Sequence, residues 1–166
     1  FEAATKGTLF LDEVANLTME TQGKLLRVLE SKRVRKVGDT AEREIDIRLI
    51  GATNRDLHEL VREGSFREDL YYRLGEIVSN IPPLGDRVGD AALLAQAFAR
   101  RFAQEQNRGS LRLSEDAMRA VEAHAWPGNV RELSSCIKRA SIMADGSQIS
   151  SDDLGLKAAA DEEAEN

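Results

Sequence analysis

Apolar residues in the first half of the chain occur in short runs that end on polar residues or proline. Runs of this length and composition are typical of strands buried on both faces, as in a parallel sheet. The runs lie at residues 7–11, 45–54 and 76–81. Segments with helical spacing separate them, and strands that alternate with helices predict an α/β layer with a parallel sheet.

The segments between these runs carry the signals of helix ends and turns. Thr18 is a predicted N-cap for a helix over 17–33, in which three leucines share one face (Leu25, Leu26 and Leu29). Asp56 and Glu59 have the spacing of a capping box for a short helix that stops at Gly64. We expect a further helix at 66–74. Residues 34–44 predict a strand, a Gly-Asp turn and polar chain.

Beyond Pro83 the pattern becomes helical throughout. Helices are predicted to begin at Asp90, after Ser114 and at Asn129, and the segment WPGN separates the last two. We expect a boundary near residues 83–88 between the α/β part and a small helical bundle. Residues 157–166 hold four acids and one lysine, and we expect this tail to be disordered.

Composition narrows the function classes. The chain has 166 residues, 42% hydrophobic and 31% charged, which is typical of a globular protein. Its formal charge of −6 gives little reason to expect strong DNA binding. A single cysteine and two distant histidines argue against a zinc centre. Without a signal peptide or a membrane-spanning run, we expect a cytoplasmic protein that does not enter the membrane.

Two acids at the end of the first run are the strongest chemical signal. The stretch TLFLDE fits a Walker B element, in which Asp12 organises Mg²⁺ on a nucleotide and Glu13 polarises the attacking water. A buried strand followed by solvated acids explains it equally well. The phosphate loop G-x-x-x-x-G-K-[ST] is absent, since the GKL at 23–25 lies inside a predicted helix and lacks the other motif residues.

Four other side chains carry weaker signals. Asn54 ends the second run, where it would orient a water or phosphate, or cap the next helix. Arg67 and Arg73 are six positions apart and can be surface arginines, one of them paired with Glu68 or Asp69. Arg131 lies in the first turn of a helix, where the dipole disfavours a cation, so it indicates an anionic partner or a nearby carboxylate.

The order of five segments carries a resemblance. GTLFLDE, GATNRDL, FREDLYYRL, IPPL and WPGNVREL resemble, in sequence and spacing, the AAA+ domain of bacterial sigma-54-dependent transcription activators, the NtrC-like enhancer-binding proteins. The resemblance covers about residues 1–155. It implies a partial P-loop NTPase-type parallel sheet over 1–84 and a helical lid over 85–156, followed by the tail.

The resemblance also implies roles, cofactors and partners. The implied site residues are Asp12 toward Mg²⁺, Glu13 toward the hydrolytic water, Asn54 as sensor I, Arg67 and Arg73 as arginine fingers in trans, and Arg131 as sensor II. The cofactors would be ATP and Mg²⁺. The partners would be the sigma-54 RNA polymerase holoenzyme and further copies in a hexameric or heptameric ring. Residues 34–44 match a surface loop that moves with nucleotide state near the sigma contact.

Parts of the family pattern are missing or altered. The sequence opens on Phe1 and resembles the C-terminal portion of the domain, without the phosphate loop, the GAFTGA loop or the DNA-binding helix-turn-helix. Gly85 and Asp86 stand where the family usually has Arg-Glu. We therefore expect the chain alone to bind ATP poorly and hydrolyse none, and its strands to have unpaired edges.

Two other classes of function remain open from the residues. A non-catalytic protein-interaction module would use the helical bundle or the acidic tail. Direct DNA binding through 128–144 ranks last, because that segment has no basic face beyond Arg131, Lys138 and Arg139.

Overall fold

The computed structural model describes residues 1–36, 38 and 41–156. The chain divides into two compact units, Phe1–Ser79 and Asn80–Asn166. Each unit is described by itself below.

The first unit is built around two parallel strands. Its elements are η1 (Glu2–Ala4), β1 (Gly7–Leu11), η2 (Val14–Asn16), α1 (Met19–Ser31), β2 (Arg33–Arg35), β3 (Glu42–Glu44), β4 (Ile47–Gly51), α2 (Leu57–Arg62) and α3 (Glu68–Leu74). β1 and β4 pair in register from Gly7↔Ile47 to Leu11↔Gly51. The α/β character predicted for this half, with a parallel sheet, is confirmed.

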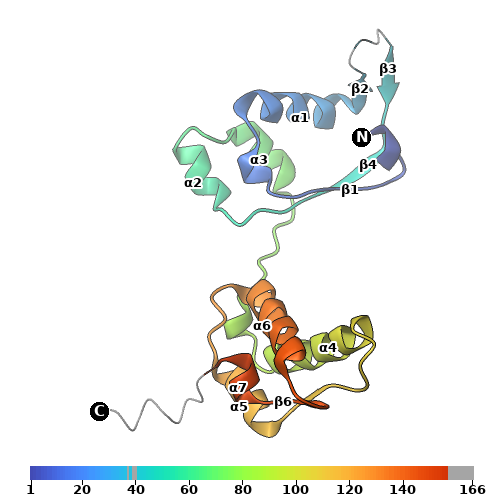
Figure 1. Ribbon diagram of the computed structural model, residues 1–166. Helices are drawn as coiled ribbons and strands as arrows, with labels where there is room; N and C mark the ends of the chain where they lie inside the picture. The colour runs from blue at the N-terminus through green and yellow to red at the C-terminus, as the bar shows by residue number, and fades with distance from the viewer. Residues whose placement is uncertain (37, 39–40, 157–166) are drawn as a thin grey trace. The chain divides into compact units, whose positions relative to one another are not determined.

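Helices α1 and α3 lie on the same side of the two strands (Figure 1). The core beneath them includes Leu25 and Leu26 of α1, Leu60 of α2 and Leu70 of α3, with Leu11 of β1 packed against it. The predicted N-caps are present. Thr18 Oγ1 accepts a hydrogen bond from the Thr21 N–H, and Asp56 Oδ1 accepts from the N–H groups of residues 58 and 59.

Strands β2 and β3 pair antiparallel, from Arg33↔Glu44 to Arg35↔Glu42. The predicted turn falls partly on residues 37, 39 and 40, which lie outside the described residues. Two ion pairs form here. Arg33 of β2 pairs with Glu42 of β3 at 3.7 Å, and Lys36 pairs with Glu2 of η1 at 3.1 Å. These exposed ion pairs each contribute little, about 0–1 kcal/mol.

The strand predicted at 76–81 is wrong. Within the described chain this segment pairs with no other strand. Its apolar side chains are exposed to solvent, with Ile77 90% and Ile81 84% exposed. A strand needs a neighbour that satisfies its N–H and C=O groups and a face that covers its side chains. Apolar composition predicts the preference for a strand but cannot reveal that the described residues supply no partner.

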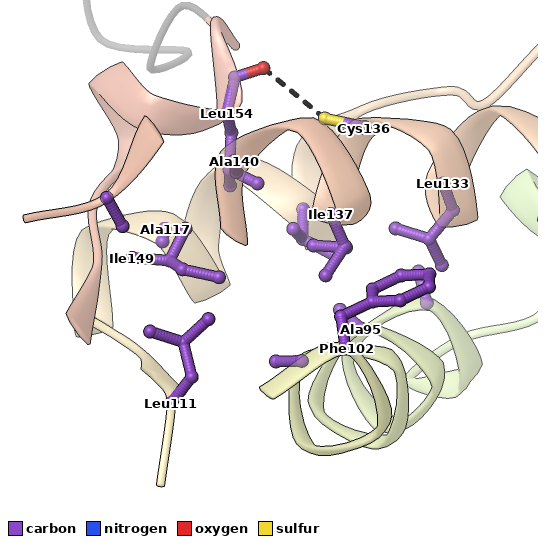
Figure 2. Packing of buried hydrophobic residues seen from close by; sticks show 14 of the residues in the cluster. Ala95, Phe102, Leu111, Ala117, Leu133, Cys136, Ile137, Ala140, Ile149 and Leu154 are labelled. Atoms are coloured by element: carbon purple, nitrogen blue, oxygen red, sulfur yellow. Dashed lines mark hydrogen bonds between the residues drawn. The ribbon is translucent and has the colours of Figure 1, made fainter. Parts of the chain in front are cut away.

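The second unit is a helical bundle with a two-stranded parallel clip. Its elements are η3 (Leu84–Asp86), α4 (Asp90–Glu105), β5 (Arg112–Leu113), α5 (Glu115–Ala123), α6 (Asn129–Met143), β6 (Gln148–Ile149) and α7 (Ser151–Leu154). Figure 2 shows its core, where Phe102 of α4 faces Leu133 and Ile137 of α6. The predicted helix starts are confirmed, with Ser114 accepting from the Ala117 N–H.

Trp126 anchors the loop between α5 and α6. Its ring is 1% exposed, and its Nε1–H donates to the Val121 carbonyl at 2.8 Å. The Asn129 side chain accepts from the Leu84 N–H at 2.7 Å and so ties η3 to the start of α6.

The predicted acidic tail, 157–166, lies outside the described residues. Among the described helices, none is long and apolar enough to cross a membrane.

Candidate nucleotide-hydrolysis site

Asp12 and Glu13 lie immediately after β1, at the carboxyl end of the parallel strand pair. Ligands of open α/β sheets bind outside this edge, so two carboxylates here are placed for chemistry. Asp12 Oδ1 accepts from the Glu13 N–H at 3.0 Å, which leaves the second carboxylate oxygen of Asp12 exposed. Asn16 Nδ2 donates to Glu13 Oε2 at 2.8 Å.

Glu13 has a left-handed backbone, with φ 52° and ψ 46°. This conformation costs a residue with a Cβ on the order of 1–3 kcal/mol and persists only where the surroundings impose it. Here the chain on both sides is fixed to β4: the Ala52 N–H donates to the Leu11 carbonyl and the Val14 N–H to the Ala52 carbonyl. A left-handed backbone held in this way is a feature that clusters at functional sites.

Asn54 is brought to the same edge by β4. It lies three residues beyond Gly51, the register partner of Leu11, and the intervening Ala52 is bonded to both sides of the Asp12–Glu13 pair. Its side chain is exposed and makes no hydrogen bond with other described residues. The neighbouring Thr53 Oγ1 accepts from the Arg55 N–H at 3.1 Å and so stabilises the turn that presents Asn54.

The donor set at this edge fits magnesium bound to a nucleotide. Magnesium is held in such sites through one or two carboxylates, with phosphate oxygens and waters as the other ligands. The Asp12 carboxylate provides the protein oxygen. Among the described residues, no group of three or more His, Cys, Asp or Glu side chains could hold a metal alone, so a cation would depend on the phosphates.

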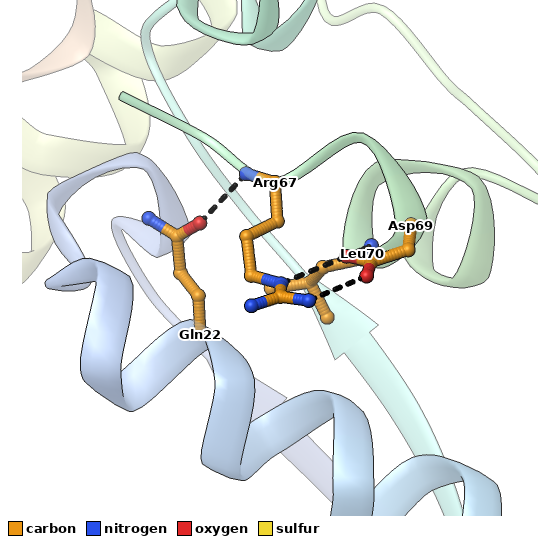
Figure 3. A network of polar contacts seen from close by, with 4 residues as sticks. All are labelled: Gln22, Arg67, Asp69 and Leu70. Atoms are coloured by element: carbon orange, nitrogen blue, oxygen red, sulfur yellow. Dashed lines mark hydrogen bonds and ion pairs between the residues drawn. The ribbon is translucent and has the colours of Figure 1, made fainter. Parts of the chain in front are cut away.

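Arg67 lies at the N-terminus of α3, and Figure 3 shows its side chain folded against Asp69. Nε and Nη2 donate to the two carboxylate oxygens of Asp69 at 3.0 Å and 2.7 Å. This bidentate pair raises the pKa of Arg67 and lowers that of Asp69, mainly through the hydrogen bonds. The pairing considered from the sequence is therefore present, and it uses two of the five N–H donors of the Arg67 guanidinium.

Arg73 lies in the last turn of α3, where the helix dipole stabilises a cation. It pairs with Glu76 at 3.6 Å, and Nη2 approaches the Leu29 carbonyl at 3.4 Å. Its side chain is 45% exposed, so both contacts can be exchanged for a stronger anion.

Arg131 belongs to the second unit and occupies the first turn of α6, as predicted. Its side chain is exposed, and the adjacent carboxylate, that of Glu132, accepts from the Gly128 N–H at 2.7 Å. Within the described residues, no hydrogen bond or ion pair holds the Arg131 guanidinium. Its charge stays exposed at a helix start.

Gln22 is a site residue that sequence reasoning missed. Its side chain is 0% exposed, although it is polar and lies among leucines of α1. Its Nε2 donates to the Leu17 and Ser65 carbonyls, and its Oε1 accepts from the Arg67 N–H at 2.8 Å (Figure 3). A glutamine on the core-facing side of an amphipathic helix was the available signal.

Comparison with known protein families agrees with this geometry. Residues 1–79 match the family described as the sigma-54 interaction domain, and residues 85–166 match the AAA+ ATPase lid domain. The first match ends where the first compact unit ends, and the second begins at residue 85, within the second unit.

Two curated relatives are similar over nearly the whole chain. The regulatory protein AtoC of Escherichia coli is 46% identical over 93% of this chain, and the alginate biosynthesis regulator AlgB of Pseudomonas aeruginosa is 46% identical over 94%. The matched stretch makes up 33% and 35% of those proteins. The chain thus spans about a third of the length of the curated relatives it matches.

A solved structure shares the fold. The crystal structure of NtrX from Brucella abortus in complex with ADP superposes with a TM-score of 0.84 at 36% identity, over 95% of this chain and 36% of that chain. A second NtrX structure, in complex with ATP, gives a TM-score of 0.83. The fold is that of an AAA+ domain, and the chain belongs to the AAA+ domain family of the sigma-54-dependent regulators.

Proposed function

We propose that this chain carries the hydrolytic and sensing residues of an AAA+ ATPase that remodels the closed complex of sigma-54 RNA polymerase. The observation that carries the proposal is the Asp12–Glu13 pair directly after β1, with a left-handed backbone at Glu13 and flanking residues bonded to Ala52, two residues before Asn54. Bound magnesium would neutralise charge on the transferred phosphoryl group.

Each residue at the edge has a distinct task in this proposal. Asp12, with one oxygen fixed by the Glu13 N–H, presents its other oxygen to the cation. Glu13 accepts a hydrogen bond from the attacking water and aligns that water with the γ-phosphate. Asn54 donates its amide to the γ-phosphate and so senses whether it is present, a role supported by its lack of any partner among the described residues.

The arginines act on charge that develops during phosphoryl transfer. We propose that Arg67 and Arg73 reach the nucleotide of a neighbouring subunit in a ring, where a guanidinium stabilises the transition state. Arg131 would contact the nucleotide from the helical lid of its own subunit. The ion pairs of Arg67 and Arg73 are exposed and therefore exchangeable, which supports this role.

The wider assembly follows from the family. The ring, of six or seven subunits, would engage sigma-54 RNA polymerase through loops that include β2 and β3, and DNA through a helix-turn-helix outside these 166 residues. The sequence of this chain contains no phosphate loop. The 166 residues alone should therefore bind ATP poorly and turn none over, because positioning of the phosphates supplies most of the catalysis.

Magnesium-dependent ATP turnover of the protein expressed from its complete gene tests the proposal. Glu13→Gln keeps the size of the side chain but removes the carboxylate, and should lower turnover by about 10²–10⁴-fold. The same variant should fail to open a sigma-54-dependent promoter in a permanganate-footprinting assay.

Glu20→Gln is the matched control, since Glu20 is an exposed glutamate in the first turn of α1 that pairs with Lys24. It should leave turnover unchanged. A Glu13→Gln protein that hydrolyses ATP at the rate of the unsubstituted protein would contradict the proposal.

A further inference from the structure

Three hydrogen bonds of one buried side chain join the start of α1 to the start of α3. Gln22 Nε2 donates to the Leu17 carbonyl at 2.8 Å and to the Ser65 carbonyl at 3.1 Å. Its Oε1 accepts from the Arg67 N–H at 2.8 Å. Leu17 is the C-cap of η2, and Glu13, which follows β1 and Asp12, is its N-cap. The hydrogen bonds of Gln22 therefore link the segment that follows β1 to Arg67, the N-cap of α3.

The primary amide suits this junction for a chemical reason. An amide side chain offers two donors and an acceptor, and here both kinds of group are used against backbone atoms. The Ser65 carbonyl and the Arg67 N–H lie outside the regular hydrogen bonds of α2 and α3, so a buried apolar side chain at position 22 would leave them unpaired. Gln22 therefore fixes backbone in two segments that are more than forty residues apart in sequence.

The backbone held by Gln22 carries the guanidinium proposed as an arginine finger. Arg67 is the N-cap residue of α3, and its side chain has no anchor among the described residues except the exchangeable pair with Asp69. The hydrogen bond from the Arg67 N–H to Gln22 Oε1 thus fixes the position of the backbone from which the guanidinium extends. A displacement of about 1 Å at that point is enough to cost on the order of 10²-fold in rate.

We propose that Gln22 is a positioning residue for Arg67, and that its amide transmits movement of the Asp12–Glu13 segment to the arginine that the subunit offers to its neighbour. This inference rests on the proposed ATPase function. It adds a connection inside one subunit between its own hydrolytic acids and the finger it provides in trans, made through Leu17, Gln22 and Arg67.

Gln22→Met tests the proposal because it keeps the length and volume of the side chain and removes all three hydrogen bonds. In the protein expressed from its complete gene, ATP turnover should fall on the order of 10²-fold, with a smaller change in KM. Gln104→Met is the matched control: Gln104 is an exposed glutamine near the end of α4 in the other unit and should give unchanged turnover.

Mixed rings separate positioning from a folding defect. Glu13→Gln subunits cannot hydrolyse but have intact arginines, whereas Gln22→Met subunits have intact acids and a misplaced arginine. In an equal mixture roughly a quarter of the interfaces join intact acids to an intact arginine, and turnover should recover accordingly. A mixture of Gln22→Met with Arg67→Ala should not recover, because both subunits fail in the same role.

Several outcomes would overturn the inference. Turnover of Gln22→Met at the unsubstituted rate would do so, as would a mixture with Glu13→Gln that stays inactive. If Gln22→Met does not fold, Gln22→Ala goes through the same mixing, because it also removes the acceptor for the Arg67 N–H. Absence of turnover in the unsubstituted protein would reject the proposed function, and this inference with it.

Discussion

The two units of the chain differ in how completely they bury their own apolar surface. In the helical unit, large side chains of α4, α5 and α6 pack around Leu133, Ile137 and Trp126, each at most 1% exposed. In the first unit, Phe10 and Ile50 are register partners on β1 and β4, yet they remain 57% and 42% exposed. A parallel sheet is normally covered on both faces.

The residues that stabilise the fold are therefore largely different from the residues proposed for hydrolysis. The side chains proposed for hydrolysis in the first unit are exposed or half-exposed and contribute little to its core, so they can be changed without unfolding it. The helical unit has one exposed candidate, Arg131, and a closed core that supports it. Substitutions in the two units should therefore register in different assays.

The largest effect should come from the first unit and be confined to activity. Arg67→Ala should lower ATP turnover of the complete protein by about 10³–10⁵-fold, because the guanidinium stabilises charge in the transition state. The midpoint of thermal unfolding should change little, since the Asp69 pair is exposed. Arg62→Ala, which removes an exposed arginine paired with Glu59, is the control and should alter neither.

The next effect belongs to the helical unit and to stability. Leu133→Ala should lower the free energy of unfolding by about 2–5 kcal/mol, because Leu133 is fully buried. Trp126 is the single tryptophan of the chain and lies in this unit, so its fluorescence in a urea titration reports this transition alone.

Leu70→Ala, at a fully buried position of the first unit, provides the comparison. Leu70→Ala should shift the unfolding transition followed by far-UV circular dichroism and leave the urea midpoint of Trp126 fluorescence unchanged. Equal shifts of the Trp126 midpoint by both variants would show that the units unfold as one.

A smaller effect is expected at the capping box of α7. The Ser150 hydroxyl accepts from the Asp153 N–H, and the Asp153 carboxylate accepts from the Ser150 N–H. Ser150→Ala should cost about 1 kcal/mol in the Trp126 transition. Ser110→Ala, at an exposed serine outside any helix, should cost nothing measurable, and an equal loss there would argue against the cap.

The smallest effect is a pH dependence of the helical unit. Hydrogen bonds from Ser114 and from Ser151 hold the pKa of Asp116 well below its usual range. A carboxyl with a lower pKa in the folded state contributes stability above its unfolded pKa and loses it as pH falls below about 4. Asp116→Asn should flatten this part of the profile of Trp126 midpoint against pH. An unchanged profile would assign the dependence to other carboxyls.

Much of the fold was predictable because its signals are local. Thr18, Asp56 and Ser114 act as the caps that their residue types predict, and the apolar run of β1 finds β4 as its parallel partner. The segment 76–81 failed because strand formation depends on a partner elsewhere, which no property of these six residues reveals.

Motif spacing predicts Asp12, Glu13 and Asn54 as candidate site residues, and the sheet register places them after the ends of two paired strands. The link from Gln22 to Arg67 could not be predicted, because it depends on the packing of α1 against α3 across 45 residues of sequence. The left-handed backbone of Glu13 was equally hidden, since glutamate has no preference for it.

That backbone has a consequence for anyone who engineers the protein. Glycine adopts the conformation at position 13 without strain, and asparagine at lower cost than glutamate. A library screened for heat resistance alone should therefore enrich replacements of Glu13, and the enriched variants should be catalytically dead. Under the proposed function, thermostabilisation of the complete protein needs a selection that also demands ATP turnover.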